Sequence, residues 1–270
     1  MLKIIKYIGI AFFCLLCVAS LAAFISSRMA LDTQFSHTES TINLPKLSSN
    51  TADGLVTVDI GSTSFRARIA GFDGNDAKPL VILLHGFPVT SAMWIELLPL
   101  LAERGFRALA IDQRGYSPGA RPGSVEGYRT MKMVEDVFSL ADVIGAQDFH
   151  LVGHDWGSAI GWYSVMKQPN RILSFTGLSV PHPHAFFSSV QNDPNQKSKS
   201  WYFTLFNLPL VPEIVLSMND FRALKIEYEV MNSTKEHDFL TVLREPGALT
   251  AALNWYRAAG KMENMLENHT

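Results

Sequence analysis

The stretch Leu151-Val152-Gly153-His154-Asp155-Trp156-Gly157 decides the fold. An apolar strand at residues 149–152 leads into a Gly-x-Asp-x-Gly turn, and a helical apolar pattern follows over residues 158–168 until Pro169 ends it. A turn this tight holds its central residue in a strained conformation between neighbours without side chains. The helix N-terminus then faces Asp155, where free N–H groups favour an ionised carboxylate. The sequence predicts a nucleophilic Asp155; the alternative is a surface turn whose aspartate caps the helix.

Two further apolar strands end in motifs of the same kind. Residues 80–84 lead into His85-Gly86-Phe87-Pro88, and residues 106–111 lead into the segment 112–117, Asp-Gln-Arg-Gly-Tyr-Ser. With these motifs in this order, the chain resembles the epoxide hydrolase branch of the α/β-hydrolase family over roughly residues 55–257. The resemblance implies a helical cap inserted over the site.

Strands and helices alternate along the chain, which predicts an α/β fold with a doubly wound, mainly parallel sheet and a site at the carboxyl ends of its strands. An antiparallel pair is expected at residues 55–60 and 65–69, helices at 91–104 and 130–144, and a further strand at 172–178. The expected domains are a core at residues 54–184, a cap at 185–257 broken near 193–195 and 246–247, and a truncated tail at 258–270.

Composition excludes several classes of protein. The 270 residues have a formal net charge of −2, and no basic patch suggests nucleic acid as a partner. The only two cysteines, Cys14 and Cys17, lie in an apolar N-terminal segment, so neither a metal site nor a redox pair is expected. No cofactor is expected.

The N-terminus predicts a contact with the membrane. Residues 7–27 form an uncharged run of 21 residues, preceded by Lys3 and Lys6 and followed by Arg28. We interpret residues 1–28 as a single-pass anchor that leaves the domain on the outer side, with a cleaved signal peptide and a secreted protein as the alternative. Residues 29–53 are rich in Ser, Thr and Asn and are expected to form a flexible linker.

An aspartate nucleophile narrows the substrate class. Its attack on an sp³ carbon leaves an ester that water can hydrolyse, so Asp155 indicates a small hydrophobic epoxide or an alkyl halide as substrate, with water as the second reactant. The resemblance implies that the backbone N–H groups of Phe87 and Trp156 form the oxyanion hole. It also implies that Tyr202 and Tyr256, in the cap, bind and protonate the epoxide oxygen.

Other polar residues near these motifs are expected to have structural roles. We expect Asp112, Arg114 and His85 to order the loops beside the elbow, and His154 to point away from the nucleophile. We also expect His182 and His184 to lie at the hinge of the cap, and Tyr163 and Tyr228 to have structural roles.

The sequence departs from the family after the cap. Family members have a late acidic residue and a later histidine that activate the hydrolytic water, whereas the tail offers only Glu263, Glu267 and His269. The sequence is therefore expected to be a fragment of a longer product or, failing that, an inactive truncated homologue. The 270-residue chain is expected to complete at most one slow turnover, with the ester accumulating on Asp155.

Two other functions are compatible with the sequence. A haloalkane dehalogenase would share Asp155 and use Trp156 as a halide donor, with Asn254 or Trp255 as a weak second candidate. A truncated, non-catalytic protein that binds hydrophobic ligands under its cap belongs to a different class.

Overall fold

The computed structural model describes residues 44–48, 51–228 and 233–260. A six-stranded sheet has the order β1-β2-β4-β3-β5-β6. Its strands are β1 (Gly54–Ile60), β2 (Thr63–Ala70), β3 (Leu80–Leu84), β4 (Arg107–Ile111), β5 (Phe149–His154) and β6 (Ile172–Leu178). β1 pairs antiparallel with β2 and β2 with β4, whereas β4, β3, β5 and β6 run parallel. The mainly parallel α/β sheet predicted from the sequence is confirmed.

Helices cover both faces of this sheet, as a doubly wound fold requires. On one face, α2 (Leu97–Glu103) contacts β2 and β4. On the other face, α3 (Thr130–Val143) and α4 (Trp156–Lys167) contact β1, β5 and β6. β3 runs between the two helix layers, and all five of its residues are buried. Leu80, Ile82 and Leu84 pack into the hydrophobic cluster on one face of the sheet, and Val81 and Leu83 pack into the cluster on the other face.

The single helix predicted at residues 91–104 is wrong. A 3₁₀ turn spans Ser91–Trp94, and α2 begins only at Leu97. Pro99 explains the break, because inside a continuous helix it would lack a donor and clash with the carbonyl of Ile95. In the observed arrangement Pro99 lies in the first turn of α2, where neither problem arises.

The other predicted elements differ from the observed ones by one or two residues, the usual uncertainty of helix and strand ends. The nucleophile strand continues to His154, and α4 begins at Trp156 instead of Ser158. Shorter 3₁₀ turns occur at Pro118–Ala120, Val125–Tyr128 and Pro169–Arg171. β6 pairs only with β5 among the described strands, and Leu173 and Leu178 on it are exposed, so this edge of the sheet carries apolar side chains.

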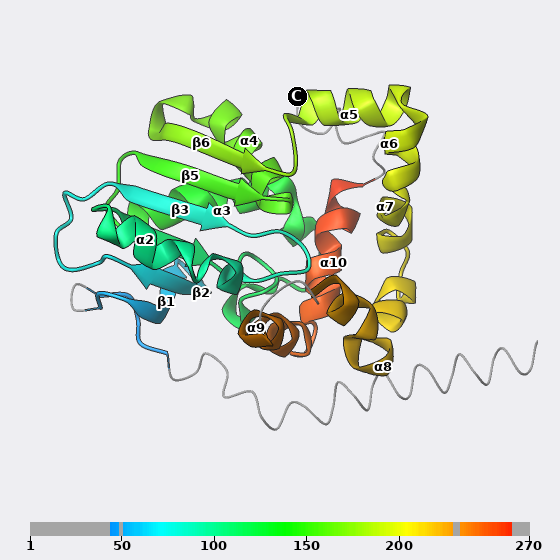
Figure 1. The fold of residues 1–270 in the computed structure, drawn as a ribbon, viewed down its shortest axis with the longest axis horizontal. Helices are drawn as coiled ribbons and strands as arrows, with labels where there is room; N and C mark the ends of the chain where they lie inside the picture. Colours follow the sequence, from blue (N-terminus) through cyan, green and yellow to red (C-terminus); the bar gives the residue numbers. More distant parts are fainter. Residues whose placement is uncertain (1–43, 49–50, 229–232, 261–270) are drawn as a thin grey trace, which may run out of the picture.

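After β6 all the described elements are helices. The helices are α5 (Pro183–Asn192), α6 (Pro194–Lys199), α7 (Trp201–Phe206), α8 (Val211–Tyr228), α9 (Ser233–Leu243) and α10 (Ala248–Ala259). Breaks occur at Asp193 and at Gly247, as predicted, and α8 is also broken where Met218 to Phe221 leave helical geometry. In Figure 1, α5 to α8 form an outer arc, and α10 lies between this arc and the sheet.

A buried ionic cluster of four charged residues, Arg66, Arg68, Asp112 and Asp238, joins α9 to the core. Arg66 on β2 forms an ion pair with Asp112 after β4, and Arg68 forms one with Asp238 on α9. Asp238 also accepts a hydrogen bond of 2.5 Å from Thr90. Burial opposes the ionisation of Asp112, but the guanidinium groups of Arg66 and Arg68 outweigh it and hold the pKa of this carboxyl well below its usual range.

Several predictions lie outside the described residues. They are the N-terminal anchor or signal peptide at 1–28, most of the linker at 29–53, and Glu263, Glu267 and His269 in the tail. The boundary between core and cap stays a prediction, although α9 and α10 both pack against core elements.

Candidate active site

The turn between β5 and α4 is a strained elbow. Asp155 has φ 53° and ψ −120°, and its N–H donates to the Leu178 carbonyl at 3.2 Å. A Cβ on Gly153 would lie 2.2 Å from the carbonyl oxygen of Gly157, and one on Gly157 would lie 2.3 Å from that of Leu84. Both positions therefore require glycine, which is the physical basis of the Gly-x-Asp-x-Gly pattern.

Backbone donors surround the Asp155 carboxylate. Oδ1 accepts a hydrogen bond of 2.9 Å from the N–H of Phe87, and the N–H of Trp156 also donates to this carboxylate. Burial raises the pKa of Asp155 above its ordinary value, and the two N–H groups oppose that rise. The structure thus brings Phe87 and Trp156 to the carboxylate, as an oxyanion hole requires.

Two tyrosines approach this carboxylate from the cap. Tyr202 on α7 and Tyr256 on α10 have ring centroids 6.1 Å apart, and the Tyr256 ring lies 5.1 Å from that of Trp156. Burial raises the pKa of Tyr202 to about 12 and that of Tyr256 well above its ordinary value, and the charge of Asp155 adds to both shifts. Both hydroxyls therefore stay protonated near neutral pH and can donate a hydrogen bond or a proton.

A small apolar pocket of about 60 Å³ opens at these groups. Asp155, Trp156, Tyr202 and Tyr256 form one part of its wall. Mainly aromatic and aliphatic residues complete it: Thr130, Ala159, Tyr163, Val180, Pro183, Phe186, Phe187 and Phe203. The pocket thus combines a carboxylate and protonated hydroxyls with a largely apolar wall.

Comparison with known proteins identifies the architecture. Residues 79–223 match the family model described as the alpha/beta hydrolase fold. The chain belongs to the α/β-hydrolase family. The AB hydrolase superfamily protein YfhM of Bacillus subtilis is 34% identical over 194 residues, covering 70% of this chain and 68% of that protein.

Within the α/β-hydrolase family the chain groups with the epoxide hydrolase branch. Epoxide hydrolase 3 of Xenopus tropicalis is 34% identical over 195 residues, covering 68% of this chain and 53% of that protein. One of the novel epoxide hydrolases found in metagenomes from hot environments has a similar structure, with a TM-score of 0.66 and 27% identity over 77% of this chain and 70% of that one. The chain thus spans about half the length of the vertebrate relative.

Two loops brace the elbow of this α/β-hydrolase. His85 is fully buried, and its Nε2 accepts a hydrogen bond of 3.0 Å from the N–H of Gln113. Burial lowers the pKa of His85 to about 4, so it is neutral and structural, as expected. Asp112 accepts a hydrogen bond of 2.7 Å from the N–H of Ser91, and Arg114 forms an ion pair of 2.6 Å with Asp136.

Among the remaining described histidines, His154 directly precedes Asp155 and the others lie farther from it along the chain. No histidine among the described residues lines the Asp155 pocket. His182 precedes α5 and accepts a hydrogen bond from the N–H of His184, consistent with a place at the cap hinge. The Nδ1 atom of His154 is buried and has no hydrogen-bond partner within the described part of the chain.

Sequence reasoning missed much of the pocket wall. Tyr163 was expected only to pack in the core, but it lines the pocket together with Thr130, Phe186 and Phe187. The Phe186-Phe187 pair, one residue after the Pro-His-Pro-His segment, is the one usable signal, because large apolar residues at the start of a cap helix have to face something buried.

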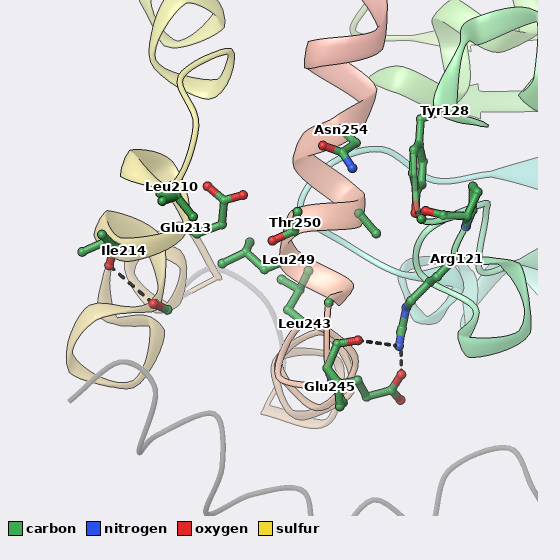
Figure 2. A pocket seen from close by; sticks show the side chains of 16 residues that line it. Arg121, Tyr128, Leu210, Glu213, Ile214, Leu243, Glu245, Leu249, Thr250 and Asn254 are labelled. Atoms are coloured by element: carbon green, nitrogen blue, oxygen red, sulfur yellow. Dashed lines mark hydrogen bonds and ion pairs between the residues drawn. The ribbon is translucent and has the colours of Figure 1, made fainter. Parts of the chain in front are cut away.

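A larger cavity of about 460 Å³ lies on another side of α10 (Figure 2). Its charged groups already have protein partners. Arg121 donates to Glu245 and to the carbonyl groups of Gly115 and Tyr116, and Glu213 forms an ion pair of 2.8 Å with Arg257. Asp155 does not line this cavity, which therefore offers neither the nucleophile nor an unsatisfied charge to a substrate.

Proposed function

We propose that this protein hydrolyses epoxides to vicinal diols through a covalent ester on Asp155. One observation supports this most strongly: the elbow presents an aspartate, and its carboxylate lies on two backbone N–H groups beside two protonated tyrosines. Relatives named epoxide hydrolases at 31–34% identity agree with it.

In the first step, an Asp155 carboxylate oxygen attacks an epoxide carbon and forms an ester bond while the carbon–oxygen bond of the ring breaks. Tyr202 or Tyr256 gives its proton to the departing oxygen, which becomes the first hydroxyl of the diol. Protonation avoids a free alkoxide in an apolar pocket, where an unpaired charge is costly. Because burial raises the pKa of Asp155, this step should slow on the acidic side at a pH above the ordinary pKa of an aspartate.

In the second step, water attacks the ester carbonyl, the carbonyl carbon–oxygen bond of the ester breaks, and the diol leaves with its second hydroxyl. Asp155 is regenerated as a carboxylate, and the proton released from the water returns to the tyrosinate. The N–H groups of Phe87 and Trp156 then stabilise the oxyanion that forms on the carboxyl group. This step also needs a base for the water. The base stays unassigned in our scheme, and the family's late acidic residue and histidine have no matching residue in the sequence.

The geometry favours epoxides over alkyl halides. A halide site needs an indole N–H that is free to face the leaving group, but the Trp156 ring lies 5.1 Å from that of Tyr256 and its side chain acts to lower the pKa of the Tyr256 hydroxyl. In our scheme, Tyr256 offers the epoxide oxygen a hydrogen-bond donor, and the Trp156 ring beside it offers the substrate an aromatic wall. The small, apolar pocket supports a compact hydrophobic epoxide as the substrate.

The proposal is tested with the full chain and two probes, styrene oxide and 1-bromobutane. We expect a mass increase equal to one styrene oxide on the intact protein, located at Asp155 by peptide mapping. The near-isosteric Asp155→Asn variant should show no adduct. Bromide release without any styrene oxide adduct would instead identify a dehalogenase, and absence of both reactions in a folded protein would refute catalysis by Asp155. Diol production without a detectable adduct would show that ester hydrolysis is the faster step.

A further inference from the structure

The cap has an apolar outer surface that no described part of the chain covers. Six large apolar side chains on and between α7 and α8 are exposed, and Trp201 and Leu210 have 64% and 65% of their surface accessible. We call them the outer cap surface: Trp201, Leu208, Leu210, Val211, Val215 and Met218. Single exposed apolar residues are ordinary, but six within 18 residues of sequence are a concentration that suits a nonpolar partner. Trp201 and Leu208 share the wall of one groove, and Leu210 borders the cavity beside α10.

Charge is nearly absent from this segment. Between residues 200 and 219 the only charged side chain is Glu213, and it is turned inward to Arg257, with oxygen–nitrogen distances of 2.8 and 2.9 Å. Exposed basic residues flank the segment: Lys197 and Lys199 precede it and Arg222 follows it. Of the nearby acidic residues, Asp220 is paired with Lys225 and Arg244 and Asp193 precedes the two lysines, so positive charge exceeds negative at the border of the outer cap surface. An acidic protein partner would leave its apolar centre unmatched.

We propose that the outer cap surface docks onto a lipid bilayer and lies in the interfacial region. Tryptophan and aliphatic side chains at the boundary between headgroups and acyl chains, with Lys and Arg at the headgroups, are typical of interfacial helices. In the described part of the chain, no single helix is long and apolar enough to cross a membrane. The pair Pro194–Phe206 and Val211–Lys225 is apolar enough when taken together, but it bends by 92° at its break. Such a bent pair suits a surface that lies on the bilayer.

The sequence supplies a second reason to choose lipid as the partner. Residues 7–27 form an uncharged run of 21, and 15 residues separate Arg28 from Leu44, the first described residue. A chain of that length reaches at most about 50 Å when extended. If residues 7–27 insert, the domain stays close to the bilayer, where a weakly binding surface has a high effective concentration of lipid.

A groove on the same surface leads toward the nucleophile. It has a volume of about 620 Å³, and Trp201 and Leu208 lie in its wall. Phe187 and Phe203 line both this groove and the Asp155 pocket, so the two spaces share part of their walls. If the proposed function holds, an epoxide dissolved in lipid would reach the pocket from the face that touches the membrane. The docking itself does not depend on that activity.

Fluorescence of the full chain on vesicles tests the docking. The probe is a 3:1 mixture of phosphatidylcholine and phosphatidylglycerol with brominated acyl chains, which quench nearby tryptophan. Of the other four tryptophans, Trp94, Trp156 and Trp255 are buried and Trp162 is half-buried against Phe175 and His182, so we expect bromine quenching to fall sharply in the Trp201→Phe variant. The double variant Leu210→Asp with Val215→Asp should lose the quenching of Trp201. The matched control, Leu100→Asp with Val143→Asp, changes two side chains that are each 55% exposed outside the cap, and it should keep the quenching.

Equal quenching of the wild type and Trp201→Phe would overturn the proposal, as would equal loss in both double variants. Sedimentation velocity without lipid separates self-association from docking. A concentration-dependent dimer that Leu210→Asp abolishes, with Trp201 unquenched on vesicles, would assign the surface to a second copy of the chain and refute the lipid partner. Circular dichroism of every variant confirms that the fold is retained, and the single variants repeat the comparison if a double variant unfolds.

Discussion

The substitution Gly86→Ala tests how closely the loop after β3 approaches the nucleophile. A Cβ on Gly86 would lie 2.3 Å from Oδ1 of Asp155 and 2.4 Å from its Cβ, whereas ordinary contacts begin near 3.4 Å. The carboxylate or the loop must therefore move by about 1 Å, which also lengthens the hydrogen bond from the N–H of Phe87. A misplacement of this size costs on the order of 10²-fold in rate, and the overpacking costs about 1–3 kcal/mol of stability.

The assay is the rate at which styrene oxide adds to Asp155, followed by intact-mass spectrometry, together with urea unfolding. Gly123→Ala is the matched control, because a Cβ there meets no atom within 4 Å and the backbone has an ordinary φ. We expect the control to react like the wild type and Gly86→Ala to react about 10²-fold more slowly while still folded. If Gly86→Ala reacts at the wild-type rate, the carboxylate does not need its observed position, and the proposed role of this loop is wrong.

The remaining predictions concern the ionic cluster, the tyrosines and a buried histidine. Asp238→Asn should lower the free energy of unfolding, measured in urea, by about 2–3 kcal/mol, because it leaves a largely buried guanidinium without its carboxylate. Glu135→Gln, in an exposed ion pair, should lower it by less than about 0.5 kcal/mol. Equal losses in the two variants would contradict a stabilising role of the cluster. Tyr202→Phe and Tyr256→Phe should each slow adduct formation by roughly 10²-fold without lowering stability as much, and unchanged rates would exclude proton donation by these hydroxyls. The pKa of His85 is lowered from 6.5 to about 4, so the unfolded chain binds a proton at this residue at a higher pH than the folded chain does. Between pH 6.5 and 4 the free energy of unfolding should therefore decrease by about 3 kcal/mol through His85. His85→Asn should lose that part of the pH dependence, and an unchanged slope would show that the buried imidazole is not its source.

The elements of the core were predictable because each has a strong local signal. β3 and β6 have the predicted bounds, since each is an apolar or β-branched run with clear breakers on both sides. The elbow followed from two glycines around one aspartate, and the structure shows the steric reason at both positions. The family resemblance implied Phe87 as a donor, and its hydrogen bond to Asp155 is present.

Contacts between distant segments were not predictable in this way. Asp238 meets Arg68 and Thr90 across 170 and 148 residues of sequence, and no local pattern marks such a pairing. Likewise, the sequence suggested only a halide as a contact for the Trp156 side chain. Its contact with Tyr256 depends on how α10 packs, which no local pattern indicates. Tyr163 was missed for a related reason, since helical periodicity does not distinguish a side chain that faces a pocket from one in the core.

The ionic cluster divides the cap into two parts with different freedom to move. α9 is fixed to β2 through Asp238, and α10 is held by the hydrogen bond of 2.7 Å from the Trp255 indole to the Arg114 carbonyl. The main contacts of α7 are with α6, α8 and α10, and its Phe206 ring also lies 5.3 Å from that of Phe87 in the core loop. A motion of α7 away from α10 would separate Tyr202 from Tyr256. If the proposed function holds, such a motion could admit a substrate only while its two proton donors are apart.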